Sequence, residues 1–268
     1  AGLAASAELL DRINVFPVAD GDTGTNLRIS LAPLRYHQEN RETTRHRLTR
    51  CATGNSGNIA AAFFREFCLA ERFEDLAAKA ALGNQNAWQA IANPCPGTML
   101  TVFDRLVLIL ASHKKEHTVY SPLRTALQEA VRATTQQLPD LSKAAVVDSG
   151  ALAMYVFFDG FFRHLTGQEE QPDSIFDLFA GQLTINAAFC QEPTDCYCVD
   201  AIIDMPQDPA VHGTMAENQA TVKDRLASLG ESVVVVHDQS LLKIHIHTAD
   251  PGRLKGQLGS LGAIVRWS

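Results

Sequence analysis

The sequence predicts an all-α N-terminal part followed by a small α+β C-terminal part. From the first residue to about residue 165, apolar residues recur at helical spacing, and no alternating β-branched run interrupts them. Residues 166–174 are polar and include Gly and Pro, which is typical of a linker. Short alternating β-branched runs follow. We therefore predict domains over 1–166 and 195–268, joined by a linker over 167–194.

The predicted helices of the N-terminal part are several times begun by Ser, Thr or Pro in first-turn positions. Their ranges are 1–13, 24–37, 56–72, 74–82, 97–112, 122–137 and 149–165. Because the first residues already have helical spacing with no capping residue before them, we expect the natural chain to begin upstream of Ala1.

The C-terminal part has the predicted element order β-α-β-β-α-β. The strands are expected over 196–204, 232–237, 241–248 and 263–267, one helix over 215–229, and another begun by Asp250 and Pro251. This order is the signature of a split-βαβ sandwich, in which two helices cover one sheet face and the first and third strands are central neighbours.

Composition excludes several classes of function. The chain has 23 basic and 30 acidic residues, a formal net charge of −7, and no block of Lys or Arg, so nucleic acid is not expected as a partner. The apolar runs are far shorter than the roughly 18 residues of a membrane span. Six cysteines in 268 residues are too few for a disulfide scaffold, and no signal-like leader opens the sequence. We expect a reduced, cytoplasmic protein.

The most informative stretch is residues 14–27, NVFPVADGDTGTNL. Asp20 and Asp22 flank a single glycine, so both carboxylates can turn toward one hard cation, with Asn14 able to add a neutral oxygen. The pattern predicts a Mg²⁺ site. It does not fit an EF-hand, because Gly24 and Leu31 stand where that loop needs ligands. Taken alone, the DGD triplet also has the composition of an ordinary surface turn.

Three further turns of small residues run directly into apolar helices: GNSG at 54–57, PGT at 96–98 and DSG at 148–150. Helix N-termini present unpaired amides and a positive dipole end, which attract phosphate oxygens, and glycine permits close approach. Each turn alone is equally an ordinary helix cap. Together with the acidic pair, they predict a nucleotide-triphosphate site that is neither a P-loop nor a Rossmann site, because neither motif occurs.

The segments NVFPVADGDTGTNL, TGNSGNIAAAF, PGTMLTV and VVDSGAL have the order and spacing of the kinase domain of bacterial fatty-acid kinases. That domain is similar to the nucleotide-binding L subunit of dihydroxyacetone kinase. After the linker, DCYCVDAII and LGESVVVVHDQSLLKIHIHTADPGRL resemble the middle domain of the same kinases. The resemblance covers nearly the whole chain.

The resemblance implies an all-α antiparallel helical barrel that binds ATP through Mg²⁺ at one end. Asp20 and Asp22 would ligate the magnesium and serve as the catalytic residues, with Asn14 beside them. The residues implied to bind the nucleotide are Thr23, Thr25, Asn26, Ser56, Gly57, Thr98, Asp148 and Gly150.

The implied reaction is phosphoryl transfer to a fatty-acid carboxylate presented by a separate DegV-like binding protein, which gives an acyl phosphate. A carboxylate is already ionised at pH 7, so no general base is required. Positioning and charge neutralisation would supply the catalysis. A homodimer is one candidate assembly.

Departures from the family pattern support a second hypothesis. The family usually has Arg where Thr53 stands and Pro where Ala19 stands, and an Arg near the phosphates would stabilise the transferring phosphoryl oxygens. The family's kinases also continue beyond the middle domain, so we expect either a fragment or a docking part supplied by another component. The alternative function is a non-catalytic nucleotide-sensing or scaffold module that binds a partner protein through the middle domain.

The C-terminal strands predict a second metal site. In LLKIHIHT, His245 and His247 share one strand face, and Cys198 on the first strand meets both if the two strands are adjacent. One thiolate and two imidazoles suit Zn²⁺, with a fourth position open to water, Asp200 or a partner. The competing interpretation is a solvated polar face that no helix covers. Metal-dependent hydrolysis ranks last, because no general base is identified.

Overall fold

The computed structural model describes residues 2–36, 40–113, 115–168, 173–190, 195–205 and 215–268. Its contacts divide the chain into two compact units. The helical unit comprises Ala1–Arg28, Ala70–Asn84 and Cys95–Glu192, and the sheet unit comprises Ile29–Leu69, Gln85–Pro94 and Pro193–Ser268. The predicted domain boundaries along the chain stay a prediction, and residues 169–172 and 191–194 of the predicted linker lie outside the described residues.

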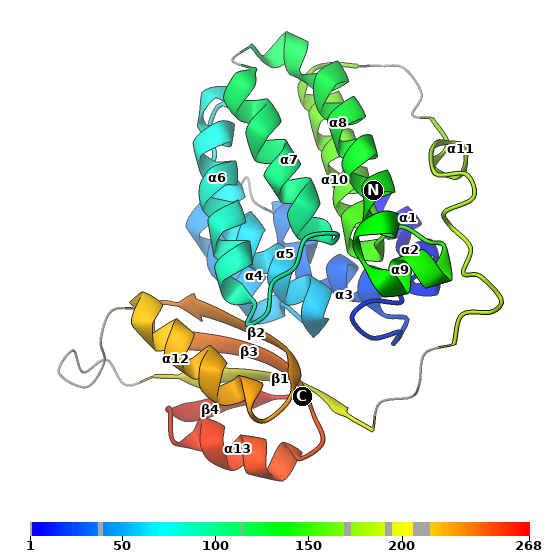
Figure 1. Cartoon of the computed structure of the whole chain (residues 1–268). Coiled ribbons are helices and arrows are strands. Elements are labelled where there is room, and N and C mark those ends of the chain that lie inside the picture. The colour runs from blue at the N-terminus through cyan, green and yellow to red at the C-terminus, as the bar shows by residue number, and fades with distance from the viewer. Residues whose placement is uncertain (1, 37–39, 114, 169–172, 191–194, 206–214) are drawn as a thin grey trace. The chain divides into compact units, whose positions relative to one another are not determined.

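The helical unit is built around three long helices. α7 (Met99–Ser112), α8 (Glu116–Gln137) and α10 (Ser149–Leu165) pack against one another, as Figure 1 shows. Apolar side chains at helical spacing fill the space between them, and Phe103 meets Phe158 edge to face. The remaining helices are α1 (Gly2–Ala5), α2 (Ala7–Arg12), α9 (Pro139–Ala144), α11 (Ile175–Leu178), and the larger parts of α3 (Thr23–Ser30) and α6 (Phe73–Ala90).

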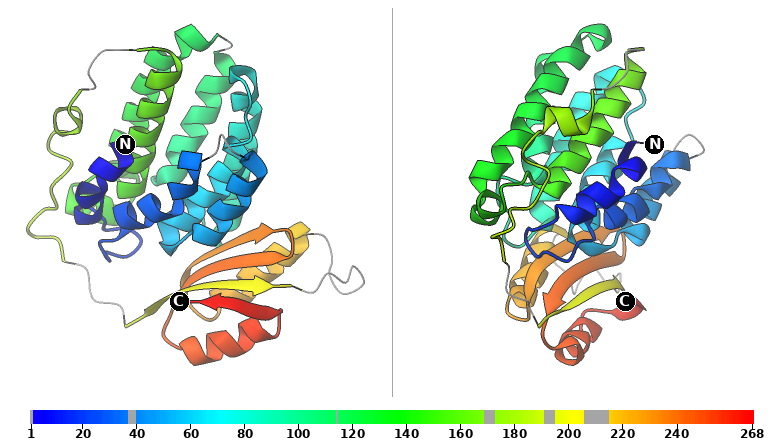
Figure 2. Two further views of the ribbon diagram at one scale, coloured as in Figure 1. Left: turned by 180° about the vertical axis from the view of Figure 1, so that it is seen from behind. Right: turned by 90° about the vertical axis from the view of Figure 1, so that its right-hand side faces the viewer.

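The sheet unit contains one four-stranded antiparallel sheet, seen from two sides in Figure 2. Its strands are β1 (Tyr197–Asp204), β2 (Glu231–Asp238), β3 (Leu241–Thr248) and β4 (Ala263–Trp267), in the order β2-β3-β1-β4. The first and third strands are therefore central neighbours, as predicted. Its helices are α4 (Arg41–Cys51), α5 (Gly54–Phe67), α12 (Met215–Ala227) and α13 (Pro251–Gly259), with a 3-10 turn at Ala32–Tyr36.

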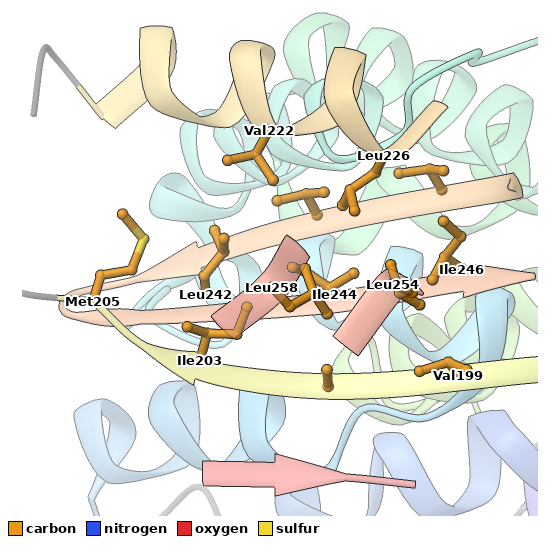
Figure 3. Packing of buried hydrophobic residues seen from close by; sticks show 13 residues of the cluster. Val199, Ile203, Met205, Val222, Leu226, Leu242, Ile244, Ile246, Leu254 and Leu258 are labelled. Carbon is orange, nitrogen blue, oxygen red and sulfur yellow. The ribbon is translucent and has the colours of Figure 1, made fainter. Parts of the chain in front are cut away.

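One face of the sheet forms the apolar core of this unit (Figure 3). Val199, Ala201 and Ile203 alternate along β1 and are buried against Leu226 of α12 and Leu254 of α13. The period of two along the strand places these side chains on the same face. The predicted inward face of the first strand is confirmed.

The opposite face is not open, contrary to the prediction that no helix covers it. α5 packs on β1, β2 and β3, and α4 packs on β2. Asp200, Lys243 and His245 consequently lie buried on that face. The prediction was wrong because α5 lies more than a hundred residues before the sheet, and local periodicity carries no information about such a contact.

Several helix boundaries differ from prediction. Residues 1–13 divide at Ser6 into α1 and α2, and residues 24–37 end as helix at Ser30, with His37 outside the described residues. α8 begins at Glu116 and carries Pro122 in its interior, although the sequence predicts this proline in a first turn. α4 was missed, because its sequence RETTRHRLTRC has almost no apolar stripe. α9 and α11 are single short turns, also missed. No helix among the described residues is long and apolar enough to cross a membrane.

Candidate nucleotide and metal sites

The acidic loop is tied to the start of α10. The Asn14 side-chain amide donates to Asp20 Oδ1 at 2.5 Å, and its oxygen accepts from the Ser149 hydroxyl at 3.4 Å. Asn14 and Ser149 are both buried. Gly21, between the two acids, has φ +68°, a conformation that glycine adopts without strain. The loop thus has a defined shape, in which Asn14 supports Asp20 through its amide.

Asp11, which the sequence patterns do not indicate, caps the helix that follows the acidic loop. Its carboxylate accepts from the Gly24 N–H at 2.6 Å, from the Thr25 N–H at 3.0 Å and from the Thr25 hydroxyl at 2.8 Å. A Cβ at Gly24 would lie 2.2 Å from the Ala7 carbonyl oxygen. Gly24 therefore allows α3 to approach α2, while Asp11 uses the first amides of α3. An Asp at the end of α2 carries no capping signal in the sequence, because its partners come 13 and 14 residues later.

Residues next to the acidic pair leave one polar atom unused. Thr23 and Asn26 are buried at the start of α3, and the Asn26 N–H donates to the Asp22 carbonyl. Among the residues that the structure describes, the Asn26 side-chain nitrogen is buried without a hydrogen-bond partner. Buried polar atoms are normally satisfied. Two carboxylates with an unused amide donor fit a Mg²⁺-bound polyphosphate, since Mg²⁺ takes oxygen ligands and phosphate oxygens accept hydrogen bonds.

The starts of α7 and α10 meet at Asp148. Its carboxylate accepts from the Ala151 N–H at 2.6 Å and from the Met99 backbone, which follows the predicted Thr98 turn. The Asp148 N–H donates to the Thr134 hydroxyl at 2.9 Å. Burial raises the pKa of Asp148 to about 7, against the opposing effect of the two backbone hydrogen bonds. This residue is therefore a carboxyl group that can gain a proton near neutral pH.

Gly150 and Thr98 shape the same region. A Cβ at Gly150 would lie 2.8 Å from the Met99 Cε, so the glycine leaves room for the start of α7. The Thr98 hydroxyl accepts from the Leu100 N–H at 3.4 Å and caps α7. Within the helical unit, the structure thus brings together the acidic loop and the turns at 98 and 148. The fourth predicted turn, with Ser56 and Gly57, lies in the other compact unit, and its place relative to the acidic loop stays a prediction.

The turn at Gly54–Gly57 is held by a residue of the sheet. Asp200 on β1 accepts from the Gly54 N–H at 2.8 Å, from the Thr53 hydroxyl at 3.2 Å and from the Asn58 amide at 3.0 Å. Thr53 stands before α5 without capping the helix by its own side chain. Where the resemblance implies an arginine, this chain therefore has a hydroxyl that is hydrogen-bonded to Asp200.

The structure brings the three predicted zinc ligands together. The β1–β3 register pairs Cys198 with His247 and Asp200 with His245. The ligand atoms of Cys198, His245 and His247 all lie within 4.8 Å of one another, and the Cys198 Sγ is 4.0 Å from the His245 Nδ1. In the described part of the chain, the buried His245 Nε2 has no hydrogen-bond partner. A thiolate and two imidazoles at this spacing fit Zn²⁺.

Asp200 also borders this cluster. It forms an ion pair with Lys243 at 2.8 Å and lies 3.7 Å from the His245 Nδ1. Burial alone would raise the pKa of Asp200, but the hydrogen bond to His245 and the charge of Lys243 outweigh it and hold the pKa well below its ordinary value. Asp200 is therefore a buried carboxylate anion that contacts both the α5 turn and a predicted metal ligand.

Comparison with known proteins identifies the class of this chain. Residues 17–163 match the DAK2 domain, and residues 194–268 match the FakA-like middle domain of fatty acid kinases. The chain belongs to the DAK2-domain family, a family of kinases. Within it, the second match makes this a FakA-like fatty acid kinase protein, which confirms the resemblance seen in the sequence.

Curated relatives are longer than this chain. Protein YloV of Bacillus subtilis is 29% identical over 294 residues, which cover 98% of this chain and 52% of that protein. An uncharacterised protein of Staphylococcus haemolyticus is 27% identical, and one of Staphylococcus aureus is 26% identical, each over 98% of this chain. The chain spans about half the length of the curated relatives that it matches.

Proposed function

We propose that this chain is the nucleotide-binding part of an ATP- and Mg²⁺-dependent phosphotransferase that acts on a fatty-acid carboxylate. Membership of the kinase family supports the reaction class. One structural observation supports the location most strongly: Asn14 hydrogen-bonds both Asp20 of the acidic loop and Ser149 beside the Asp148 turn. The acid pair and the amide-rich helix starts of one unit are thereby neighbours, as a Mg²⁺-polyphosphate requires.

In this proposal, Asp20 and Asp22 hold the magnesium, and Asn14 orients Asp20. Bound Mg²⁺ would neutralise charge on the β- and γ-phosphates. The proposed nucleotide contacts are Thr23, Thr25, Asn26, Ser56, Gly57, Thr98, Asp148 and Gly150. Because the Thr25 hydroxyl is bonded to Asp11, Thr25 acts by shaping the loop.

The acceptor in the proposed reaction is a fatty acid held by a DegV-like partner protein. A carboxylate oxygen attacks the γ-phosphorus, the bond to the β-phosphate oxygen breaks, and the products are an acyl phosphate and ADP. The attacking oxygen carries no proton, so no residue of this chain needs to act as a base. The residues of the site position the phosphates and balance their charge.

The second metal belongs to the same proposal. Cys198, His245 and His247 would hold Zn²⁺ with a fourth position for water or another ligand, and the ion would stabilise the local arrangement of β1 and β3. We further propose that the helical part forms an antiparallel barrel and that the sheet with α12 and α13 is a split-βαβ sandwich, as the resemblance implies.

A second candidate function is a nucleotide-sensing module without transferase activity. Thr53 favours it, because its hydroxyl supplies no fixed positive charge for the transferring phosphoryl oxygens. In this case, ATP would bind with Mg²⁺ but no phosphate would leave it.

Transfer of labelled γ-phosphate separates the two functions. The full natural protein is incubated with labelled ATP and Mg²⁺, with and without a DegV-like carrier loaded with fatty acid. The kinase proposal predicts a labelled, hydroxylamine-sensitive acyl phosphate only when the loaded carrier and Mg²⁺ are both present. ATP binding without any transfer would contradict it and support the sensor.

A further inference from the structure

Asp200 connects two places that have separate roles in the proposed function. On one side, it accepts hydrogen bonds from Thr53, Gly54 and Asn58 at the start of α5. On the other side, it contacts Lys243 and His245 of β3. Its side chain is almost fully enclosed, with the residue 5% exposed. One carboxylate therefore fixes the position of the helix start relative to the strand that carries two predicted metal ligands.

The α5 turn depends on this carboxylate for its shape. Gly54 has φ +66°, and Thr53 does not cap the helix with its own side chain. The Gly54 N–H is satisfied by Asp200 instead. A hydrogen bond from a buried amide to an ionised acceptor is stronger than one to a neutral acceptor, and its loss leaves the amide unsatisfied. Lys243, which is 1% exposed, keeps the acceptor ionised.

The metal cluster depends on the same carboxylate. Histidines that bind a metal through one ring nitrogen usually donate their other N–H to a carboxylate, which fixes the orientation of the ring. Asp200 Oδ2 lies 3.7 Å from the His245 Nδ1, while the His245 Nε2 is buried without a hydrogen-bond partner among the described residues. Asp200 is therefore suited to orient His245 for a metal.

We propose that Asp200 is a positioning residue shared by the metal cluster and the α5 turn, so that a divalent transition metal at Cys198, His245 and His247 orders the turn at 53–58. Metal binding restrains His245, His245 restrains Asp200, and Asp200 restrains the Gly54 amide. By reciprocity, an ordered turn binds the metal more tightly. The inference rests on the proposed function only where Ser56 and Gly57 are taken to hold phosphate.

Hydrogen exchange tests the coupling without any nucleotide. The amides of peptides covering 53–62 are followed by mass spectrometry in the zinc-loaded protein and after chelation, for the wild type, Asp200→Asn and Cys198→Ser. We expect chelation to speed exchange in the wild-type peptide by at least about threefold. Asp200→Asn should exchange rapidly with or without zinc, and Cys198→Ser should resemble the chelated wild type. Equal exchange in loaded and chelated wild type, or an unchanged response to zinc in Asp200→Asn, would overturn the proposal.

Two further variants keep the test informative. Asp238→Asn is the matched control, because Asp238 is equally buried on the same sheet and pairs with Arg65 of the same helix, eleven residues after Gly54. It should leave the zinc response of 53–62 intact, and loss of the response there would contradict a specific role of Asp200. Asp200→Asn/Lys243→Met removes both charges, so that no unpaired buried ammonium remains to unfold the protein. It should show the same loss of zinc response.

Nucleotide affinity then separates this inference from the proposed function. If Ser56 and Gly57 hold phosphate, Asp200→Asn lowers the affinity for Mg²⁺-ATP by about tenfold, and chelation of zinc lowers it in the wild type only. If the wild type binds no nucleotide, the proposed function fails while the exchange result still decides the coupling. If nucleotide binds equally well in all forms while exchange responds, the phosphate role of Ser56 and Gly57 fails.

Discussion

The side-chain amide of Asn14 donates a hydrogen bond to the Asp20 carboxylate at 2.5 Å. The sequence suggested Asn14 as an oxygen ligand of the metal, whereas in the structure its nitrogen faces Asp20 and its oxygen accepts from Ser149. Asn14 is thus placed to hold the acidic loop in shape before a metal arrives.

Replacing Asn14 tests this supporting role. Asn14→Ala removes both hydrogen bonds but leaves the two carboxylates, so we expect the affinity for Mg²⁺-ATP to fall by about tenfold while binding remains measurable. Titration calorimetry gives the affinity. Asn84→Ala is the control, because Asn84 forms a comparable pair with Asp104 in the same unit, away from the loop. Equal losses in the two variants would show that the effect is general destabilisation.

Gly24 should not tolerate a side chain. A Cβ there would lie 2.2 Å from the Ala7 carbonyl oxygen, and a backbone atom cannot move aside without shifting α2 or α3. We expect Gly24→Ala to lower the free energy of unfolding by about 3 kcal/mol. Gly160→Ala, in an α10 position with no atom within 4 Å, should be neutral or raise it by about 0.5–1 kcal/mol. Urea denaturation compares them, and similar stabilities would disprove the close approach.

Asp148 predicts a specific dependence of stability on pH. Burial raises its pKa from the ordinary 3.8 to about 7 in the folded protein. Between these values the folded state holds more protons than the unfolded state, so the contribution of Asp148 to stability is fully present below about pH 4 and is lost as the pH rises to 7. Asp148→Asn keeps a side-chain oxygen to cap α10 but cannot ionise.

The variant should therefore gain stability over the wild type as the pH rises from 4 to 8. Urea midpoints measured without Mg²⁺ or nucleotide give the difference at each pH. A difference that stays constant over this range would show that Asp148 is not a buried acid of raised pKa.

The metal cluster predicts a difference between two neighbouring cysteines. Both Cys196 and Cys198 are exposed, but only Cys198 belongs to the cluster with His245 and His247. Elemental analysis of the purified wild type should find roughly one zinc ion per chain, as expected for a single three-ligand site. Cys198→Ser should lose most of the metal, and Cys196→Ser should keep it. A wild type without metal would rule out the site.

The sequence predicted the C-terminal part closely because its signals are local. Period-two alternation predicted the bounds of β3 and β4 to the residue, and the same period placed His245 and His247 on one face. The adjacency of Cys198 followed from the element order alone. Long-range pairing of two strands was predictable here because one topology accounted for all six elements.

The remaining features depend on contacts that no local pattern encodes. Asp200 was predicted only as one candidate for a fourth metal ligand, since nothing in its surroundings indicates that Gly54, 146 residues earlier, donates to it. Asp11 was missed for the same reason, and α4 was missed because its stability comes from packing on α5 and β2 and not from an apolar stripe of its own. Tertiary contacts decided all three.

Calorimetric titration of Mg²⁺-ATP into the wild type and Asp20→Ala tests the nucleotide site most directly. We predict Mg²⁺-dependent binding to the wild type and a loss of at least about a hundredfold in affinity for Asp20→Ala, because removing one of two carboxylates leaves the metal without its anionic pair. Asp140→Ala, at an exposed acid of α9, should bind as the wild type does. Equal affinity of Asp20→Ala and the wild type would contradict the proposed site.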